Sequence, residues 1–232
     1  MKLYGKKALL NNIENINLVR LVHNDNAIID ILKENKIKYI FVNQNYFKAF
    51  DKNLNHQYIE SETVERNNET WEEFIKNSKQ ERMFVVILDS LQDPFNFGSI
   101  IRTCESFNVD AIVYKKDNQV QINDFVKKTS QGAINNIRMF KVVNLSNEIE
   151  FLKQNKFWIY ASVINEKASS YNNIDYDKKT CLIVGNEEKG ISLSLQKNAD
   201  FLITIPTEGK TSSLNVSVAC GIIISMIKIK QK

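Results

Sequence analysis

The feature that most constrains the fold is a continuous apolar run, Met83-Phe84-Val85-Val86-Ile87-Leu88. A run of this length without a polar residue is typical of a parallel strand that is covered on both faces. Further strand-like segments follow at residues 111–114, 158–162, 181–184 and 201–205. Helical patterns separate them at residues 99–107, 124–130, 146–154 and 192–198. Strands that alternate with helices predict an α/β unit with a mostly parallel sheet.

The N-terminal part of the chain predicts a second, smaller α/β unit. Its strand-like segments are residues 19–22, 38–42 and 57–59. A helical pattern at residues 26–35, with Asn26 as a candidate cap, and a short helix at residues 46–50 lie between them. These alternating elements favour an independent unit of about the first 60 residues.

The two units are joined by a stretch that predicts a linker. From Glu60 to Arg82 the composition shifts to Glu, Asn and Lys, with few large apolar residues. Within this stretch Thr70 and Glu73 have the spacing of a capping box, which predicts a short helix on an exposed tether. We therefore divide the chain into a small domain at residues 1–64, a linker at 65–81 and a larger domain at 82–232.

Composition excludes several classes of protein. Cys104, Cys181 and Cys220 have neither paired spacing nor neighbouring histidines, so we expect no disulfide framework and no metal site. The N-terminus lacks the apolar core of a signal peptide, and the longest apolar run, residues 216–227, is too short to span a bilayer. We therefore expect a soluble, cytoplasmic protein without a membrane partner. A net charge of +4 permits an RNA partner without requiring one.

Prolines and glycines mark three loops that need unusual backbone geometry. Both prolines of the chain, Pro94 and Pro206, follow predicted strands, and five of the seven glycines fall in the same loops or in the helices after them. In parallel sheets ligands bind beyond the carboxyl ends of the strands. These three loops are therefore the candidate binding sites.

The first loop, residues 89–102, holds two polar residues of interest, Asn96 and Arg102. The two are six residues apart, so they would not share a face of one helix, and their convergence requires a loop position for Asn96. Arg102 lies among apolar neighbours, where an unpaired charge is costly. It could equally extend to solvent or pair with Asp89 or Glu105.

The second and third loops follow the strands at residues 181–184 and 201–205. In the second, Gly185 would let a ligand approach the backbone and Glu187 would lie at the edge of the sheet, although this pattern is also that of a simple turn. In the third, an apolar helix begins with uncharged polar residues, which either cap the helix or bind a ligand; these are Ser213, Asn215 and Ser217.

Missing motifs narrow the chemistry further. The chain has no G-x-G-x-x-G, Walker or H-E-x-x-H sequence, which argues against a nicotinamide enzyme, a P-loop NTPase and a zincin. Its two histidines, His23 and His56, lie in the small unit. We therefore do not expect acid–base catalysis by histidine.

Taken together, the segments at residues 96–102, 184–190 and 205–219 resemble the three motifs of the SpoU/TrmH family of RNA ribose 2′-O-methyltransferases in order and spacing. The resemblance covers residues 82–232. It implies an α/β fold with a trefoil knot, in which S-adenosylmethionine binds to the knotted loops. Residues 1–64, with Tyr4-Gly5 and His56-Gln57, are similar to the L30e-like RNA-binding domain of the branch that modifies a guanosine of 23S rRNA. That branch usually has Gly where this chain has Tyr58.

The resemblance also implies roles for individual residues. Contacts with the cofactor would come from Gly185, Ile205 and Leu214. The catalytic set would be Asn96, Arg102, Glu187, Ser213 and Asn215. The family's usual proposal makes the arginine a base, but its pKa above about 12 favours a different role for Arg102: it would hold the 2′-oxygen and a neighbouring phosphate. Glu187 could orient Arg102, and the remaining members would fix the ribose and the loop.

The reaction implied is methyl transfer from S-adenosylmethionine to a ribose 2′-hydroxyl, with rRNA favoured over tRNA as the substrate and no metal required. The resemblance further implies a homodimer through the last helix, residues 216–228, although this helix could equally be buried in its own core. Two alternatives remain open at this point. The chain could be a tRNA ribose 2′-O-methyltransferase, or a non-catalytic RNA-binding assembly factor of the same fold.

Overall fold

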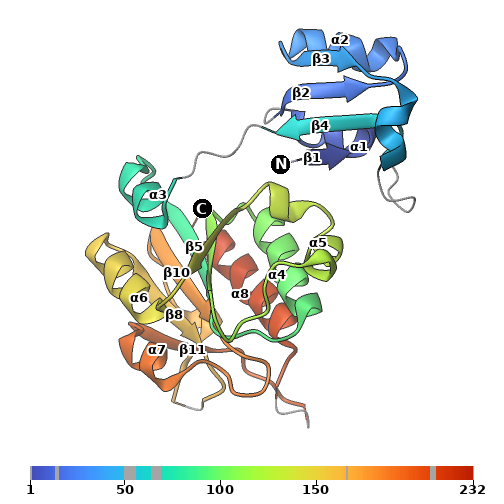
Figure 1. The fold of residues 1–232 in the computed structure, drawn as a ribbon. Coiled ribbons are helices and arrows are strands. Elements are labelled where there is room, and N and C mark those ends of the chain that lie inside the picture. Colours follow the sequence, from blue (N-terminus) through green and yellow to red (C-terminus); the bar gives the residue numbers. More distant parts are fainter. Residues whose placement is uncertain are drawn as a thin grey trace. The chain divides into compact units, whose positions relative to one another are not determined.

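The computed structural model describes residues 2–13, 16–49, 56–63, 69–165, 167–209 and 213–231. The chain forms two compact units, Met1–Glu69 and Thr70–Lys232, which Figure 1 shows in one view and which we describe separately.

The small unit is a four-stranded sheet with helices packed on it. The strands lie in the order β1-β4-β2-β3, where β2 and β3 are parallel and β4 is antiparallel to both of its neighbours. They are β1 (Lys2–Tyr4), β2 (Ile16–Leu21), β3 (Lys38–Phe41) and β4 (Ile59–Thr63). The helices are α1 (Lys6–Leu10), α2 (Asn26–Glu34) and the 3₁₀ helix η2 (Gln44–Ala49). Leu9, Val19 and Leu32 join helices and sheet in one apolar core.

Two predictions for the small unit are wrong in detail. The cap of α2 is Asp25, which accepts a hydrogen bond from the backbone of Ile28, and Asn26 is the first helical residue. The linker does not begin at Glu60, because Glu60 lies inside β4 with its side chain fully buried. Its carboxylate accepts hydrogen bonds from Arg20 at 2.9 Å and from Lys2 at 3.2 Å. The composition around Glu60 could not predict this burial, because the partners that stabilise its charge lie about 40 and 60 residues away in the sequence.

The predicted helix near Thr70 exists, but it is not on an exposed tether. Helix α3 (Trp71–Asn77) begins with a complete capping box, in which Thr70 and Glu73 each accept a hydrogen bond from the other's backbone. Trp71 and Ile75 are buried in a core cluster of the large unit. The helix therefore belongs to the large unit.

The large unit is built on a seven-stranded sheet whose pairings are all parallel, which confirms the predicted α/β unit with a mostly parallel sheet. The strands lie in the order β7-β6-β5-β10-β8-β11-β9. They are β5 (Met83–Leu88), β6 (Ala111–Lys115), β7 (Arg138–Val142), β8 (Trp158–Ser162), β9 (Ser169–Ser170), β10 (Lys179–Val184) and β11 (Phe201–Thr204). The five predicted strands are present, whereas β7 and β9 at the two edges were not predicted.

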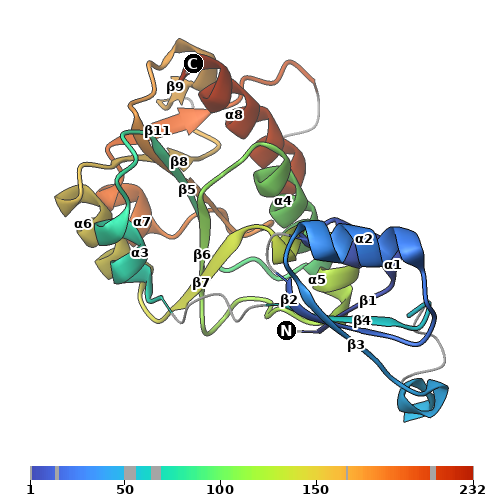
Figure 2. The same ribbon diagram turned by 90° about the horizontal axis from the view of Figure 1, so that it is seen from above.

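Helices cover both faces of this sheet, as Figures 1 and 2 show. One face carries α4 (Pro94–Ser106), α5 (Asp124–Thr129) and α8 (Val216–Lys230). The other carries α3, α6 (Leu145–Gln154) and α7 (Leu193–Asn198). None of the helices in the described ranges is long and apolar enough to cross a bilayer.

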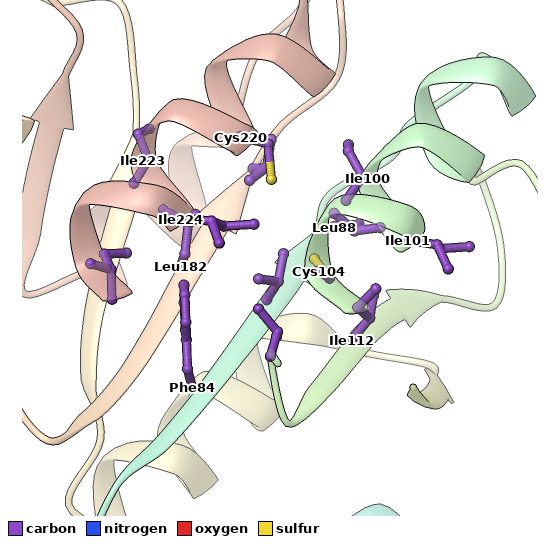
Figure 3. Packing of buried hydrophobic residues seen from close by; sticks show 14 of the residues in the cluster. Phe84, Leu88, Ile100, Ile101, Cys104, Ile112, Leu182, Cys220, Ile223 and Ile224 are labelled. Atoms are coloured by element: carbon purple, nitrogen blue, oxygen red, sulfur yellow. The ribbon is translucent and has the colours of Figure 1, made fainter. Parts of the chain in front are cut away.

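Helix α8 packs one side into the core of its own unit. Figure 3 shows its residues facing α4 above the sheet; the labelled residues are Phe84, Leu88, Ile100, Ile101, Cys104, Ile112, Leu182, Cys220, Ile223 and Ile224. The opposite side of α8 leaves Val218 and Ile229 exposed. Burial in its own core therefore accounts for only part of the apolar character of this helix.

Candidate active site

A cavity of about 480 Å³ lies at the carboxyl ends of β8, β10 and β11. This is the place where parallel sheets bind ligands, and the volume is in the range of small-molecule sites. Its walls include the apolar side chains of Val163, Ile164, Ile205 and Leu214. Ile205 and Leu214 are two of the three residues predicted to contact a cofactor, and Ser213 of the predicted catalytic set also lines the cavity.

The charges around the cavity favour a cationic group. Glu187 and Glu188 both line it, and no lysine or arginine does so among the lining residues within the described ranges. A carboxylate at the rim attracts a positive centre in a ligand and repels an anion. The cavity thus combines apolar walls with negative charge at one end.

The loop after β10 owes its shape to Gly185 and Gly190. The backbones of Asn186 and Gly190 exchange two hydrogen bonds of 3.0 Å, and Gly190 has a φ of +67°. A Cβ at Gly185 would lie 2.3 Å from the backbone carbon of Gly190. Gly185 is buried and is not one of the lining residues. We predicted that a glycine is needed at position 185 so that a ligand can approach the backbone. The structure shows a different need: a residue without a side chain lets the loop fold back on itself.

Three members of the predicted catalytic set are joined by hydrogen bonds. The amide of Asn96 donates to Glu187 at 3.1 Å, and the amide of Asn215 donates to the Asn96 side-chain oxygen at 3.0 Å. Glu187 also accepts from the backbone of Gln92 and Asp93, at 3.3 Å each, at the start of α4. A carboxylate at a helix N-terminus is favourable. This network, Glu187–Asn96–Asn215, ties the three predicted loops together.

Asn215 has a second function, because it is the N-cap of α8. Its side-chain oxygen accepts from the backbone of Ser217 at 2.9 Å and from the Ser217 hydroxyl at 2.7 Å. The cap interpretation of this segment is therefore confirmed for Asn215, and its hydrogen bond to Asn96 also joins it to the predicted site residues. Both polar atoms of the Asn215 amide are engaged within the protein.

The predicted convergence of Asn96 and Arg102 does not occur within one chain. Helix α4 begins at Pro94, where Asp93 accepts a hydrogen bond from the backbone of Phe95, so Asn96 is helical and not in a loop. The two residues then point about 120° apart around the helix axis. No partner of Arg102 occurs in the described part of the chain, so Glu187 does not orient it.

Arg102 extends to solvent, one of the alternatives that the sequence left open. Its other expected partners are engaged elsewhere: Asp89 with Lys115 at 3.4 Å, and Glu105 with Asn136 at 3.2 Å. Arg102 lines a separate groove with Phe95 on α4 and with residues of α5.

Sequence reasoning missed two parts of the site. Asp89 is 2% exposed and accepts a hydrogen bond from the backbone of Ser192 at 2.8 Å, which fixes the loop after β10 to the end of β5. Ser162, the last residue of β8, and residues 163–165 after it line the cavity. Both follow predicted strands, so the position of these residues at carboxyl ends was the available signal.

Comparison with known proteins identifies relatives of both the sequence and the fold. Residues 83–225 match the SpoU rRNA Methylase family. An uncharacterized tRNA/rRNA methyltransferase of Mycoplasma genitalium is 38% identical over 232 residues, which cover 96% of this chain and 94% of the relative. A Staphylococcus epidermidis protein, named as a TrmH family tRNA/rRNA methyltransferase, is 35% identical over 202 residues, covering 85% of this chain and 80% of the relative.

Among solved structures, the SpoU methyltransferase AviRb from Streptomyces viridochromogenes, in complex with the cofactor AdoMet, is similar with a TM-score of 0.74. The similarity covers 100% of this chain and 90% of that chain, at 16% sequence identity. At this identity the similarity concerns the fold, and it agrees with a mixed α/β architecture around a mostly parallel sheet.

Proposed function

The chain belongs to the SpoU/TrmH family of RNA methyltransferases, and we propose that it transfers a methyl group from S-adenosylmethionine to a ribose 2′-hydroxyl of RNA. The observation that carries this proposal is the cavity beyond β8, β10 and β11, which joins apolar walls to the carboxylates of Glu187 and Glu188. S-adenosylmethionine supplies an activated methyl group on a positively charged sulfur, and a negatively charged, partly apolar cavity fits such a molecule.

The cofactor would be held by side chains of two loops. Ile205 and Leu214 would pack on its apolar parts, and Glu187 would face its positive charge. Gly185 would contribute by allowing the loop after β10 to close beside it. The residues present fit this ligand without a metal, because an activated donor needs positioning and proton removal rather than a Lewis acid.

The remaining members of the catalytic set would position the ribose. Ser213 lies at the cavity, while Asn96 and Asn215 line a polar groove on the other side of Glu187. Arg102 would hold a phosphate and stabilise negative charge that develops on the 2′-oxygen as its proton passes to water. We assign it this role because its guanidinium is exposed and has no partner in the described part of the chain.

A homodimer would bring Arg102 to a cavity that it does not reach within its own chain. Helices α4 and α8 pack side by side, with Gly221 of α8 next to Thr103 of α4. The outer side of α8 exposes Val218 and Ile229, which suits contact with a second copy. We propose a dimer through α8 in which each chain presents Arg102 to the site of the other.

We further propose that the substrate is a guanosine of 23S rRNA, that residues 1–64 form an L30e-like RNA-binding domain, and that the larger unit contains a trefoil knot. One observation supports the role of the small unit. Tyr58 has a φ of +56°, the left-handed conformation that favours glycine, so the loop keeps the backbone geometry expected of the Gly in this branch. A tRNA substrate is the alternative, since the relatives are named for both RNAs.

The test is methyl transfer from labelled S-adenosylmethionine to 23S rRNA and to tRNA in separate reactions. Arg102→Ala should abolish transfer and leave the melting temperature unchanged, because this side chain has no partner to lose among the residues that the structure describes. Lys197→Ala, on the exposed surface of α7, is the control and should retain full activity. Near-normal activity of the Arg102 variant, or wild-type protein that methylates neither RNA, would contradict the proposal.

A further inference from the structure

Two phenylalanines form an exposed aromatic pair next to the candidate site. Phe95, in the first turn of α4, is 59% exposed, and Phe125, in α5, is 61% exposed. Their ring centroids lie 6.4 Å apart with an angle of 57° between the planes. Large apolar side chains that gather on the surface mark an interaction site more often than a single exposed one does.

The position of the pair is fixed by close packing of α4 on α5. A Cβ at Gly98 would lie 2.6 Å from Thr129 and 3.0 Å from the backbone oxygen of Val126. The missing side chain at Gly98 therefore lets the two helices approach, and this sets the spacing of Phe95 and Phe125. The rings are held by rigid elements, which reduces the entropy that a ligand must overcome.

The groove beside the rings is basic. It has a volume of about 770 Å³ and contains Arg102 and Lys128, and no aspartate or glutamate occurs among the lining residues that the structure describes. The groove around Glu187 differs, because its lining includes the carboxylates of Asp89, Asp93 and Glu188. The phosphates of an RNA are therefore attracted to the first groove, whereas the second, which also holds Asn96 and Asn215, repels phosphates and suits the uncharged ribose.

Exposed aromatic rings together with cations are the chemistry that binds unpaired RNA. Bases stack on the rings, and arginine and lysine hold the phosphates. Duplex RNA does not offer its base faces for stacking. A second copy of this chain fits the groove less well, because a two-fold contact centred on the groove would place this basic surface against itself, and the proposed dimer contact is formed by α8 instead.

We propose that the groove between Phe95 and Phe125 binds an unpaired stretch of the substrate RNA beside the nucleotide that is methylated. Its bases stack on the two rings, and its phosphates contact Arg102 and Lys128. The proposal rests on the proposed function, since it concerns the same substrate. It adds that the target ribose lies in single-stranded RNA, because the groove contains Arg102, the residue proposed to contact the 2′-oxygen of the target.

The experiment measures binding and not methyl transfer, so it is separate from the test of the reaction. Fluorescence anisotropy of the full chain with a labelled unstructured RNA should show about 5-fold or greater weakening for both Phe95→Ala and Phe125→Ala, the loss expected when one stacked base loses its ring. Phe125→Trp should retain the wild-type affinity, because it keeps an aromatic face. Leu193→Ala, which removes an exposed apolar side chain on α7, is the matched control and should bind normally.

Three further readouts decide the interpretation. Binding of S-adenosylmethionine by calorimetry should be the same in all variants, because neither ring lines the cavity. Affinity for a duplex RNA should change little. The proposal is overturned if both alanine variants bind the unpaired RNA as the wild type does, if duplex binding falls equally, or if sedimentation shows loss of a dimer while RNA binding remains intact.

Discussion

Replacing Gly185 by alanine should disrupt the loop that closes the candidate cofactor cavity. The new Cβ would lie 2.3 Å from the backbone carbon of Gly190 and 2.3 Å from the backbone nitrogen of Ile191. Real Cβ atoms essentially never come closer than 3.0 Å to such atoms. Both are backbone atoms, so no flexible side chain can move aside. Relief requires the strands of the loop to separate and the two Asn186–Gly190 hydrogen bonds to break.

The size of the effect follows from these contacts. Two lost backbone hydrogen bonds cost about 1 kcal/mol each, and overpacking of a tight site costs about 1–3 kcal/mol. Because the strain is relieved as the bonds break, the total should be about 2–4 kcal/mol. For a protein of this size each kcal/mol shifts the melting temperature by about 2–4 °C, so we expect a decrease of roughly 4–16 °C.

Gly221→Ala is the matched control, because it adds the same methyl group where there is room. The Cβ would lie 3.6 Å from Thr103 on α4, an ordinary contact, and Gly221 is inside α8. Alanine stabilises a helix interior by about 0.5–1 kcal/mol relative to glycine. Thermal unfolding and calorimetry with S-adenosylmethionine should therefore show a less stable, weakly binding Gly185 variant and a slightly more stable Gly221 variant. A Gly185 variant with wild-type stability and affinity would refute the reasoning.

Two further predictions concern ionisable groups of the large unit. Burial, together with the charge of Glu72, raises the pKa of the Glu148 carboxyl, so the folded state holds this proton more tightly than the unfolded state and the charged form opposes folding. Glu148→Gln should therefore raise the melting temperature at pH 7, with a gain that shrinks as the pH falls towards about 4; a gain that is constant with pH would point to another cause. Cys104, Cys181 and Cys220 are fully buried, and burial raises the pKa of the Cys104 and Cys181 thiols. The native protein should not react with Ellman's reagent at pH 8, whereas the denatured chain should react at all 3 cysteines; rapid reaction of the native protein would show that the packing around at least one of these cysteines opens.

The sequence predicts best those elements whose residues are buried on both faces. Strands β5 and β8 match the predicted ranges in full, because central strands read as apolar runs. Strand β7 was missed, since it lies at an edge and each of its residues is partly or fully exposed. Strand β9 has two residues and gives no pattern of its own.

In the candidate site, features that depend on neighbouring residues could be predicted from the sequence, whereas contacts between residues far apart in the chain could not. The positions of the loops after the strands were predicted from Pro94, Pro206 and the glycines, which act on the backbone around them, but the first loop ends at Asp93 and not at Arg102. The start of α4 was misplaced although its signal was present, because Asp93-Pro94 is a typical cap followed by proline at the first helical position. The hydrogen bond between Asn96 and Asn215 spans 119 residues, and no spacing in the sequence encodes it.

We predicted that Glu187 orients Arg102, but the two side chains lie apart. A physical argument favours this separation. If Glu187 paired with Arg102, the carboxylate would be neutralised and would no longer favour a cation in the cavity, while the guanidinium would have fewer donors left for a phosphate. Asn96 binds Glu187 without cancelling its charge, because its amide is neutral. Helix α4 thus carries Asn96, a neutral partner of Glu187, at its start, and about two turns later Arg102, which is unpaired among the described residues. The two charges keep opposite preferences for ligands within one chain, and in the dimer that we propose they would meet only when the RNA and the second copy complete the site.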